Sequence, residues 1–338
     1  MKRAVILFNL GGPDKLENVE PFLFNLFNDP AIISVPSIFR YPLAKFISKR
    51  RAPIAKNIYR EIGNKSPILE LTQDQAKSLE NSLLEKGDYK CFIVMRCWYP
   101  RASDVIKKVR EYNPEEIILL PLYPQFSAST SGSSINEWNK ICEKENYKVK
   151  TKTICCYPTE NNFIESHISL IKKALKILEN NNFKLIFSAH GLPENKIKNG
   201  DPYQWQVEAT VKEIMSKMKN ENLDYIISYQ SRVGPMKWIG PSTEEVIIKY
   251  SKEKRGIVIV PIAFVSEHSE TLVELDIEYK KLAKKNGCNF YKRVPALGIE
   301  ENFIKGLTEL VLQKQTKGNF VSSVMCPNKY IKCPCLGL

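Results

Sequence analysis

The feature that most constrains the fold is an alternation of two kinds of segment along the 338-residue chain. Short apolar runs, many of them β-branched, alternate with longer segments in which apolar residues recur every three or four positions. The first pattern is typical of buried parallel strands and the second of amphipathic helices that connect them. The expected strands cover residues 4–9, 91–95, 116–124, 151–157, 184–189, 224–229 and 256–264. The pattern predicts an α/β protein with doubly wound parallel sheets.

The order of these segments also predicts the domain organisation. Helical periodicity is expected from residue 59 onward and over residues 102–112, 163–180, 206–220 and 301–315. The strands and helices form two similar series with a break near residues 158–165, and a non-repetitive tail follows them. We therefore expect an N-terminal domain over residues 1–157, a C-terminal domain over 158–315 and a tail over 316–338.

The composition limits the classes of partner. Fifty Lys and Arg residues against 37 Asp and Glu residues give a formal charge of +13, which favours an anionic partner such as nucleic acid, lipid headgroups or an acidic small molecule. No apolar window reaches the roughly 18 residues that a membrane span needs, and the opening MKRAVILFNLGGPD lacks a signal-peptide cleavage site. The nine cysteines are typical of reduced thiols. These features predict an unprocessed, intracellular chain.

The motifs that carry chemistry follow the expected strands. LGGP, MRCWYP, YPQFSASTSGSS, SAHGLP and AFVSEHSE each come after a strand, where parallel α/β sheets bind their ligands. No G-x-x-x-x-G-K-[ST] phosphate loop is present in the sequence. The clustering predicts a single site at the carboxyl ends of the strands.

The stretch SEHSETLVELDIEYKK concentrates carboxylates beside a histidine. If it is an α-helix, Glu270, Glu274 and Glu278 share a stripe of about 80°. We call these three residues the acid row. A solvated helix face, a cation site and a proton path are the three interpretations, and the apolar neighbours of the row disfavour the first. His190 and His268 follow expected strands, so both are functional candidates, whereas His167 lies within an amphipathic helix and is expected to be structural.

The segment from residue 30 to 53 mixes bulky apolar side chains with Arg40, Lys45, Lys49, Arg50 and Arg51. Three interpretations remain open for it. The first is a lip that contacts a membrane surface and offers cations to an apolar, acidic ligand. The second is a patch that binds nucleic acid, and the third is an ordinary amphipathic surface helix. No recognised nucleic-acid module accompanies it, so we do not expect nucleic acid as the partner.

The tail MCPNKYIKCPC has C-x6-C-x-C spacing through Cys326, Cys333 and Cys335. Three thiols this close favour zinc or an iron–sulfur cluster, and uncoordinated thiols are the third option. One ligand is missing from the set. Cys155 or Cys156 could supply it, but only one of them, because adjacent residues of a strand point to opposite faces.

Taken together, the motifs resemble the ferrochelatase family, which inserts ferrous iron into a porphyrin. The resemblance runs nearly end to end through NLGGPD, SKRRAP, NKSP, MRCWYP, YPQFSASTSGSS, SAHGLP with NGDPY, QSRVGPMKWIGP and PIAFVSEHSETLVELDIEY. It implies two Rossmann-like domains with a porphyrin cleft between them. It also implies that His190 and Glu270 form the central catalytic pair and transiently hold the substrate iron, and that Glu274 and Glu278 continue the acidic path. The substrate-binding candidates that it implies are Arg50, Arg51, Tyr59, Arg96, Tyr123, Ser129, Met236, Trp238, Phe264 and His268.

The chemistry of metal insertion agrees with these residue types. A free porphyrin carries two pyrrole N–H protons, so metal entry requires a bent ring and a base that receives the protons. A histidine beside a carboxylate serves near neutral pH, and ferrous iron accepts nitrogen and oxygen ligands. The residue types leave open whether His190 acts mainly as a base or mainly as a ligand of the metal ion.

The resemblance implies protoporphyrin IX and ferrous iron as substrates in the last step of heme synthesis, in the cytoplasm on the inner membrane, with a homodimer as an option. Insertion into coproporphyrin, cobalt insertion and a non-catalytic porphyrin carrier are the alternatives. Animal members place a cluster cysteine where this chain has Ala128, so that ligand set does not transfer. Some bacterial members take the fourth ligand from mid-chain, which fits Cys155 or Cys156 and predicts a 2Fe-2S cluster, with zinc as the alternative.

Overall fold

The structure is a computed structural model that describes residues 1–178, 182–219, 222–234, 236–313 and 319–336. The chain divides into two compact units. Unit 1 contains Met1–Cys156 and Leu307–Ser322, and unit 2 contains Tyr157–Gly306 and Ser323–Leu336. Each unit is built around its own sheet, so the predicted α/β class with two parallel-sheet domains is confirmed.

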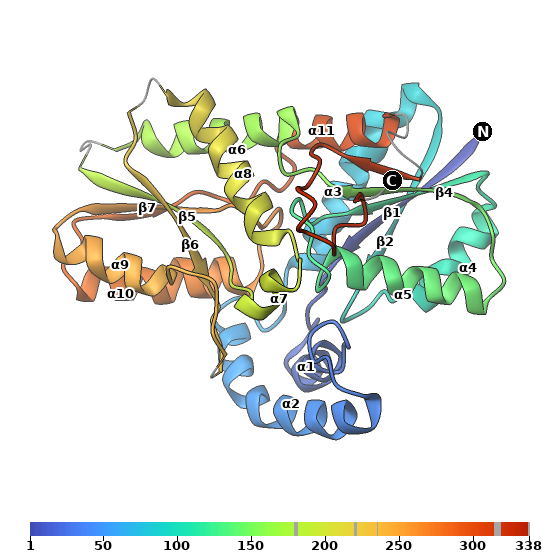
Figure 1. The fold of residues 1–338 in the computed structure, drawn as a ribbon, viewed down its shortest axis with the longest axis horizontal. Helices are drawn as coiled ribbons and strands as arrows, with labels where there is room; N and C mark the ends of the chain where they lie inside the picture. Colours follow the sequence, from blue (N-terminus) through green and yellow to red (C-terminus); the bar gives the residue numbers. More distant parts are fainter. Residues whose placement is uncertain (179–181, 220–221, 235, 314–318, 337–338) are drawn as a thin grey trace. The chain divides into compact units, whose positions relative to one another are not determined.

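Unit 1 is built on a parallel sheet. Its strands, in spatial order, are β2 (Asp88–Met95), β1 (Lys2–Asn9), β3 (Glu116–Pro121), β4 (Lys150–Cys156) and β9 (Phe320–Ser322). The helices of this unit include α3 (Ile68–Leu83), α4 (Ala102–Tyr112) and α5 (Ser131–Lys144), together with the part of α11 (Glu301–Leu312) from Leu307 onward. Figure 1 shows α4 and α5 on one face of this sheet and α3 and α11 on the other. The central strand β1 is therefore apolar on both faces, and its residues 4–8 are fully buried.

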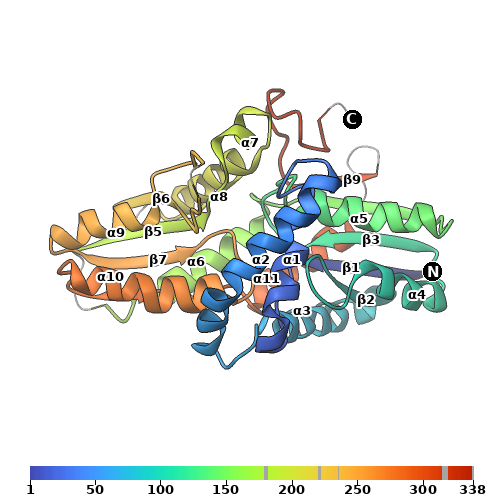
Figure 2. The same ribbon diagram turned by 90° about the horizontal axis from the view of Figure 1, so that it is seen from below.

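Two further helices in unit 1, α1 (Val19–Phe27) and α2 (Ser37–Arg60), pack against each other (Figure 2). Helix α2 contains Pro42 and Pro53, and it leaves bulky apolar side chains exposed while burying mostly small ones such as Ala44 and Ala52. Over the residues that the structure describes, no helix is both long and apolar enough to cross a bilayer.

Unit 2 is built on a second parallel sheet. Its strands, in spatial order, are β6 (Tyr225–Gln230), β5 (Phe183–His190), β7 (Gly256–Pro261) and β8 (Tyr291–Arg293). Its helices are α6 (Asn161–Leu175), α7 (Glu194–Lys198), α8 (Tyr203–Lys217), α9 (Thr243–Lys252) and α10 (Tyr279–Lys285). Figure 1 shows α6 and α8 on one face and α9 and α10 on the other.

Short 3₁₀ helices η1 (Leu16–Asn18) and η2 (Leu84–Lys86) complete the described elements of unit 1.

The segment that carries the acid row is a π-helix, η4 (Glu270–Glu278), which continues directly into α10. The predicted stripe of about 80° assumed an α-helix over this segment, and the observed backbone differs from that assumption. A π-helix bonds each N–H to the carbonyl five residues earlier, is rare, and occurs frequently at functional sites. The acid row therefore lies on an unusual backbone.

All seven expected strands are present, with ends that differ by a few residues. The prediction missed β8 and β9, which have three residues each. A surface helix was one of the three interpretations of residues 30–53, and α2 occupies most of that segment, but it ends at Arg60, where a helix was expected to begin near residue 59. Residues 307–322 belong to unit 1 and 323–336 to unit 2, which differs from the predicted grouping beyond residue 306. The predicted boundary between 315 and 316, and the end of the helix expected over 163–180, lie outside the described residues.

Candidate active site

The candidate active site in unit 2 starts at the carboxyl ends of two neighbouring strands. His190 is the last residue of β5 and Gln230 the last residue of β6, and the two are paired in register. The chain then reaches η4 through the loop that follows β7, and η4 begins at Glu270. The fold thus brings the SAHGLP and SEHSE motifs to one edge of the sheet, as their positions after strands predicted, and it brings QSRVG to the same edge.

His190 and Glu270 face each other at this edge. Nε2 of His190 lies 3.6 Å from Oε1 of Glu270, and the side chains are 41% and 29% exposed. Nδ1 of His190 lies 2.6 Å from the carbonyl oxygen of Gly191. Because that carbonyl only accepts, Nδ1 carries the proton in the neutral imidazole, and the lone pair of Nε2 points toward Glu270. The pair can therefore accept a proton or bind a metal ion at Nε2.

His268 lies on the other side of Glu270. Its Nε2 is 4.0 Å from Oε2 of Glu270, and its ring packs edge-on against Phe264 with 4.6 Å between ring centroids. Burial lowers the pKa of His268, although Glu270 and Glu267 raise it. Among the described residues, Oε2 of Glu270 and Nδ1 of His268 are buried without a hydrogen-bond partner. Buried polar atoms are nearly always hydrogen-bonded, so these two indicate a place for a ligand or water.

Glu274 is held by several donors. Its carboxylate accepts hydrogen bonds from the backbone N–H of Ser231 at 2.9 Å, the hydroxyl of Ser231 at 2.5 Å, Nε2 of Gln230 at 3.0 Å and the hydroxyl of Tyr279 at 2.8 Å. Burial raises the pKa of Glu274, and the nearby Glu270 raises it further, while the bonds from Ser231 and Tyr279 lower it. Glu274 is thus a half-buried acid whose pKa is raised above its ordinary value.

The acid row becomes more exposed along η4. Glu270 and Glu274 are half-buried, whereas Glu278 is exposed. Among the described residues, no Lys or Arg side chain forms an ion pair with any of the three. The solvated-face interpretation therefore fits Glu278 but does not fit Glu270 or Glu274.

The other two carboxylates of this stretch have a different partner. Arg293, at the end of β8, contacts Glu267 and Asp276 at 2.8 Å each. Burial lowers the pKa of Arg293, but the two carboxylates more than compensate and raise it above its usual value. Glu267 and Asp276 are therefore neutralised structural acids. This pairing could not be predicted from the sequence, because Arg293 lies 17 residues beyond Asp276.

Trp238 and Met236 lie after β6 in the QSRVGPMKWIGP motif. Trp238 forms a β-bridge with Pro193, and its indole Nε1 is buried without a hydrogen-bond partner among the described residues. Met236 is 52% exposed. A Cβ atom on Gly191 would lie 3.3 Å from the Trp238 ring, so glycine permits this close approach. An indole N–H and an exposed thioether are suited to contact with a large, mostly apolar ligand.

The candidates in the first half of the chain lie in unit 1. Arg96 is already bound by acids, with 3.0 Å to Asp29 and 3.2 Å to Glu137. Burial raises the pKa of Tyr123. The hydroxyl of Ser129 donates to the carbonyl oxygen of Ala31 at 3.2 Å. These contacts show that Arg96 is a partner of acidic side chains within its own unit.

Three further candidates lie on α2. Arg50 and Arg51 are exposed, and the guanidinium of Arg51 lies over the ring of Phe27 with 5.7 Å to the centroid. Tyr59 is 6% exposed and packs into a cluster with Trp98. Among the described residues, Arg50 and Arg51 form no ion pair with a carboxylate, in contrast to Arg96. These two arginines retain their full capacity to bind an anion.

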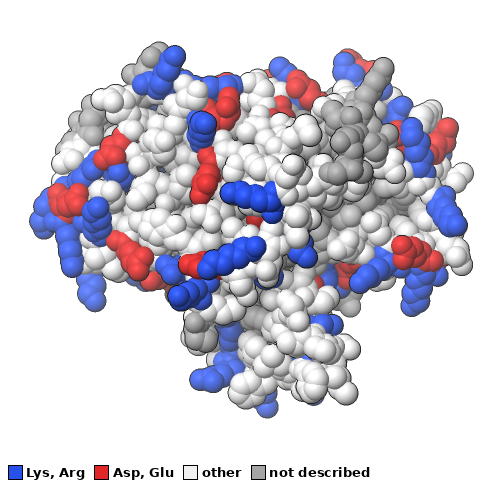
Figure 3. Space-filling view, in the orientation of Figure 1, with Lys and Arg blue, Asp and Glu red and all other residues white. Residues whose placement is uncertain are grey.

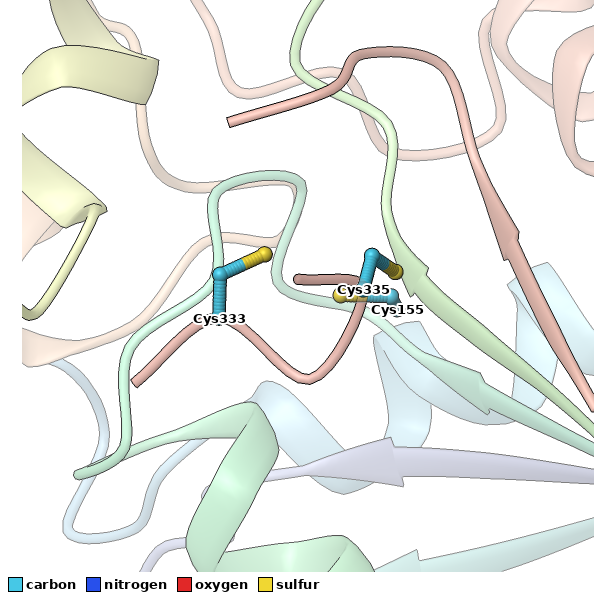
Figure 4. Close-up of side chains that lie close together, drawn as sticks. All are labelled: Cys155, Cys333 and Cys335. Carbon is cyan, nitrogen blue, oxygen red and sulfur yellow. The ribbon is translucent and has the colours of Figure 1, made fainter. Parts of the chain in front are cut away.

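The structure brings together part of the predicted cysteine set. The sulfur atoms of Cys155, Cys333 and Cys335 all lie within 4.8 Å of one another (Figure 4). The sulfur of Cys156 lies instead 3.2 Å from the hydroxyl of Ser322. Strand alternation predicted that only one residue of the pair 155 and 156 would join the group, and Cys155 is that residue.

Cys326 is outside this group of sulfur atoms. It is 6% exposed, and its sulfur accepts a hydrogen bond from Nε2 of Gln206 at 3.2 Å. Gln206 is itself fully buried on α8. Three of the predicted ligands are therefore close together, and the fourth is held by a separate hydrogen bond.

Sequence reasoning missed the residues that bind the acid row. Gln230, Ser231 and Tyr279 all contact Glu274, yet none was a candidate. The available signal was the polar pair Gln230–Ser231 at the carboxyl end of β6, in the same position relative to its strand as His190. Ser231 also has a φ of 58°, a left-handed conformation that is uncommon for serine.

Comparison with known proteins identifies the family of the chain. Residues 2–315 match the family model described as Ferrochelatase. The chain is 65% identical to the Ferrochelatase of Pelagibacter ubique (strain HTCC1062), over 99% of each chain. It is 50% identical to the Ferrochelatase of Rickettsia felis, over 98% of this chain and 97% of the relative.

Two solved structures share the fold. SirB from Bacillus subtilis with Fe3+ aligns with a TM-score of 0.56 and 14% identity, covering 92% of this chain and 95% of that one. The sirohydrochlorin chelatase SirB from Bacillus subtilis subspecies spizizenii, in complex with cobalt, aligns with a TM-score of 0.52 and 11% identity, over 90% and 92% of the two chains. At these identities the likeness concerns the fold alone.

Proposed function

Because this chain belongs to the ferrochelatase family, we propose that it inserts ferrous iron into protoporphyrin IX, forming protoheme and releasing two protons. The observation that carries the proposal is the His190–Glu270 pair, with Nε2 and Oε1 3.6 Å apart at the carboxyl edge of a parallel sheet. An imidazole lone pair beside a carboxylate provides both a base for pyrrole protons and N/O ligands for ferrous iron.

In this mechanism Nε2 of His190 accepts the two pyrrole protons one after the other, and it passes the first to the acid row before it accepts the second. The resulting imidazolium is stabilised by Glu270, at 3.6 Å, and by the Gly191 carbonyl that accepts from Nδ1. The base and ligand roles use the same lone pair, so they alternate rather than coincide: Nε2 binds iron only while it is unprotonated.

The acid row then carries protons away. Glu274 is the next carboxylate along η4, and burial together with Glu270 raises its pKa, so it can take up a proton. Glu278 is exposed and releases protons to solvent. When Glu274 is protonated, its O–H needs a hydrogen-bond acceptor. Only the hydroxyls of Ser231 and Tyr279 can accept this bond, because the other two contacts of Glu274 come from N–H groups.

We assign the anionic groups of the porphyrin to Arg50 and Arg51 rather than to Arg96. The guanidinium of Arg96 already contacts Asp29 and Glu137, so a propionate would have to compete with two carboxylates. Met236, Phe264 and Trp238 supply apolar surface for the ring.

The test is anaerobic metal insertion by the purified parent chain, with protoporphyrin IX and coproporphyrin III in competition. We expect protoporphyrin to be converted to protoheme with the higher kcat/KM, because its fewer carboxylates need fewer cations. Preference for coproporphyrin, or for cobalt over ferrous iron, would replace the assigned substrate. Tight porphyrin binding without turnover would indicate a carrier.

For the cysteines, we propose a 2Fe-2S cluster bound by Cys155, Cys326, Cys333 and Cys335. Three of the four sulfur atoms lie within 4.8 Å of one another, and such clusters are held by four thiolates. Cys326 completes the set if its sulfur leaves the hydrogen bond from Gln206. The cluster would serve a structural or redox-sensing role, since the cysteine tail is not one of the motifs that carry the candidate active site.

Iron and sulfide content and paramagnetic resonance spectra of anaerobically purified protein test the cluster. Cys155→Ser should abolish the spectrum, whereas Cys156→Ser, the matched control on the same strand, should retain it. One bound zinc without sulfide would overturn the proposal.

For the cellular location, we propose peripheral binding of α2 to the cytoplasmic face of an anionic inner membrane. Helix α2 presents exposed apolar side chains at Ile38, Phe39, Tyr41, Leu43, Phe46 and Ile54. Figure 3 shows the α1–α2 region, at the bottom of the view, largely free of charged side chains but with Lys and Arg at its edges. Lys49, Lys56 and Arg60 of this helix, together with Glu20 of α1, line a surface hollow of about 420 Å³. Apolar area with flanking cations is typical of interfacial helices.

Vesicle sedimentation tests this location. We expect binding to vesicles that contain phosphatidylglycerol, weaker binding at high salt, and loss of binding in an Ile38→Ser, Phe46→Ser variant. Leu84→Ser, which changes a 72% exposed leucine elsewhere on unit 1, is the control. Equal binding by both variants would contradict the proposal.

A further inference from the structure

Gln230 is a buried amide that contacts two members of the acid row. It is 1% exposed at the end of β6. Its Nε2 donates to Oε2 of Glu274 at 3.0 Å and to the backbone carbonyl of Glu270 at 3.3 Å. One side-chain amide therefore connects the first turn of η4 to the strand that pairs with β5.

The amide of Gln230 is also held by a group on the neighbouring strand. The hydroxyl of Ser188, on β5, donates to Oε1 of Gln230 at 2.8 Å. Ser188 is fully buried and also lies 3.0 Å from the hydroxyl of Thr243, which lies 2.9 Å from the hydroxyl of Ser228. If the amide were rotated, its oxygen would face the carboxylate of Glu274 and its NH₂ would face Ser188. The three hydrogen bonds of the amide form together only in the observed orientation, because the carboxylate of Glu274 and the carbonyl of Glu270 both need a donor.

Ser231, the residue after Gln230, also holds the carboxylate of Glu274. Ser231 donates to Glu274 through both its backbone N–H and its hydroxyl. It adopts a φ of 58°, which is unfavourable for a serine and persists only where the surroundings enforce it. Two consecutive residues at the end of β6 thus direct three donors at one carboxylate.

We propose that Gln230 is a positioning residue for the reaction, and that through its amide it sets the distance between Glu270 and His190 and the orientation of Glu274. His190 is the register partner of Gln230, so the bond from Gln230 to the Glu270 carbonyl fixes η4 relative to the residue that carries the base. Ser188, two residues before His190, holds the amide in place. This inference rests on the proposed chelatase function, and it assigns Gln230 and Ser188 no contact with substrate.

The kinetic test uses Gln230→Met, which preserves length and removes both donors. We expect kcat for iron insertion to fall about tenfold or more, because bonds to charged groups are lost, while KM for porphyrin changes less than about twofold. Ser188→Ala should lower kcat by about two- to fivefold in the parent and have no further effect in the Gln230→Met background, because Ser188 acts through Gln230. Ser166→Ala, which removes another fully buried serine hydroxyl of unit 2, is the control and should leave kcat unchanged.

A second readout does not depend on turnover. In the parent, the side-chain amide protons of Gln230 should exchange slowly with solvent in NMR spectra, and Ser188→Ala should accelerate that exchange whereas Ser166→Ala should not. Fast exchange in the parent would overturn the inference. So would a folded Gln230→Met protein with parental kcat, or additive effects of the Ser188 and Gln230 substitutions. A parent without turnover but with slow, Ser188-dependent exchange would count against the proposed function and not against the attachment of the acid row.

Discussion

Two groups of carboxylates lie within twelve residues of each other in unit 2 and have opposite environments. Glu267 and Asp276 both contact Arg293 at 2.8 Å. Glu270 and Glu274 have no cationic Lys or Arg partner among the described residues, and they contact His190, Gln230, Ser231 and Tyr279 instead. The difference shows that a carboxylate neutralised by a buried arginine contributes to stability, whereas one held by neutral donors and a histidine remains available for proton and metal chemistry.

The largest loss of kcat is expected when His190, the proposed base, is substituted. His190→Ala removes the lone pair of Nε2 that faces Glu270. General acid–base groups contribute about 10²- to 10⁴-fold, so we expect kcat to fall by that factor with little change in the free energy of unfolding, because His190 is 41% exposed. Anaerobic turnover and urea unfolding measure the two quantities. Parental turnover would remove His190 from the mechanism.

Substitution of Arg293, which pairs with Glu267 and Asp276, is expected to lower stability rather than turnover. Arg293→Met leaves Glu267 and Asp276 without their cation, and the arginine is only 10% exposed. We expect the free energy of unfolding to fall by about 2 to 4 kcal/mol, less than for a fully buried pair because Asp276 is partly exposed. Urea unfolding measures the loss, and kcat of the remaining folded protein should stay within about threefold of the parent. A variant as stable as the parent would show that the pair is not structural.

A small effect is expected at the exposed end of the acid row. Glu278 is exposed, so solvent can replace it as the final proton acceptor. Glu278→Gln should therefore reduce kcat by less than about threefold, far less than substitution of a general base. Steady-state kinetics at several buffer concentrations check this, since added buffer should restore the rate. A loss comparable to that of His190→Ala would make Glu278 part of the catalytic centre.

The smallest expected effect is a change in how the free energy of unfolding depends on pH. Burial and Glu270 raise the pKa of Glu274 in the folded state, so between its ordinary pKa near 4.5 and the raised value the folded chain binds more protons than the unfolded chain. Stability from this group is then present at low pH and lost as pH rises through the raised pKa. Glu274→Gln should remove this loss, so its stability relative to the parent should improve from pH 4.5 toward 7. Urea unfolding across that range measures the slope, and a parallel pair of curves would contradict the raised pKa.

The sheets could be predicted because their central strands are buried on both faces and therefore read as continuous apolar runs. Strands β8 and β9 could not, since three residues are too few to show a period. Helix α2 contains two prolines and exposes its large apolar side chains, so its sequence lacks the pattern of a helix that packs on a core.

The candidate site was predictable where the signal is local. His190 and Glu270 stand out as a histidine after a strand and an acid in a cluster, and the alternation of side chains along β4 limited the choice between Cys155 and Cys156 to one residue. The partners that separate the two groups of carboxylates are not local: Arg293 lies 17 residues beyond Asp276, and Gln230 lies 44 residues before Glu274. The sequence thus revealed the acids but not which of them are neutralised.

The most direct test compares two substitutions three residues apart, Glu267→Gln and Glu270→Gln, in the same anaerobic assay of iron insertion into protoporphyrin IX, with porphyrin binding and urea unfolding measured in parallel. The account predicts that Glu270→Gln binds porphyrin and unfolds like the parent but loses about 10²- to 10⁴-fold in kcat. It predicts that Glu267→Gln unfolds more easily and yet turns over normally when folded. If both variants lost activity equally, or if Glu270→Gln turned over like the parent, the division between paired and available acids would be wrong.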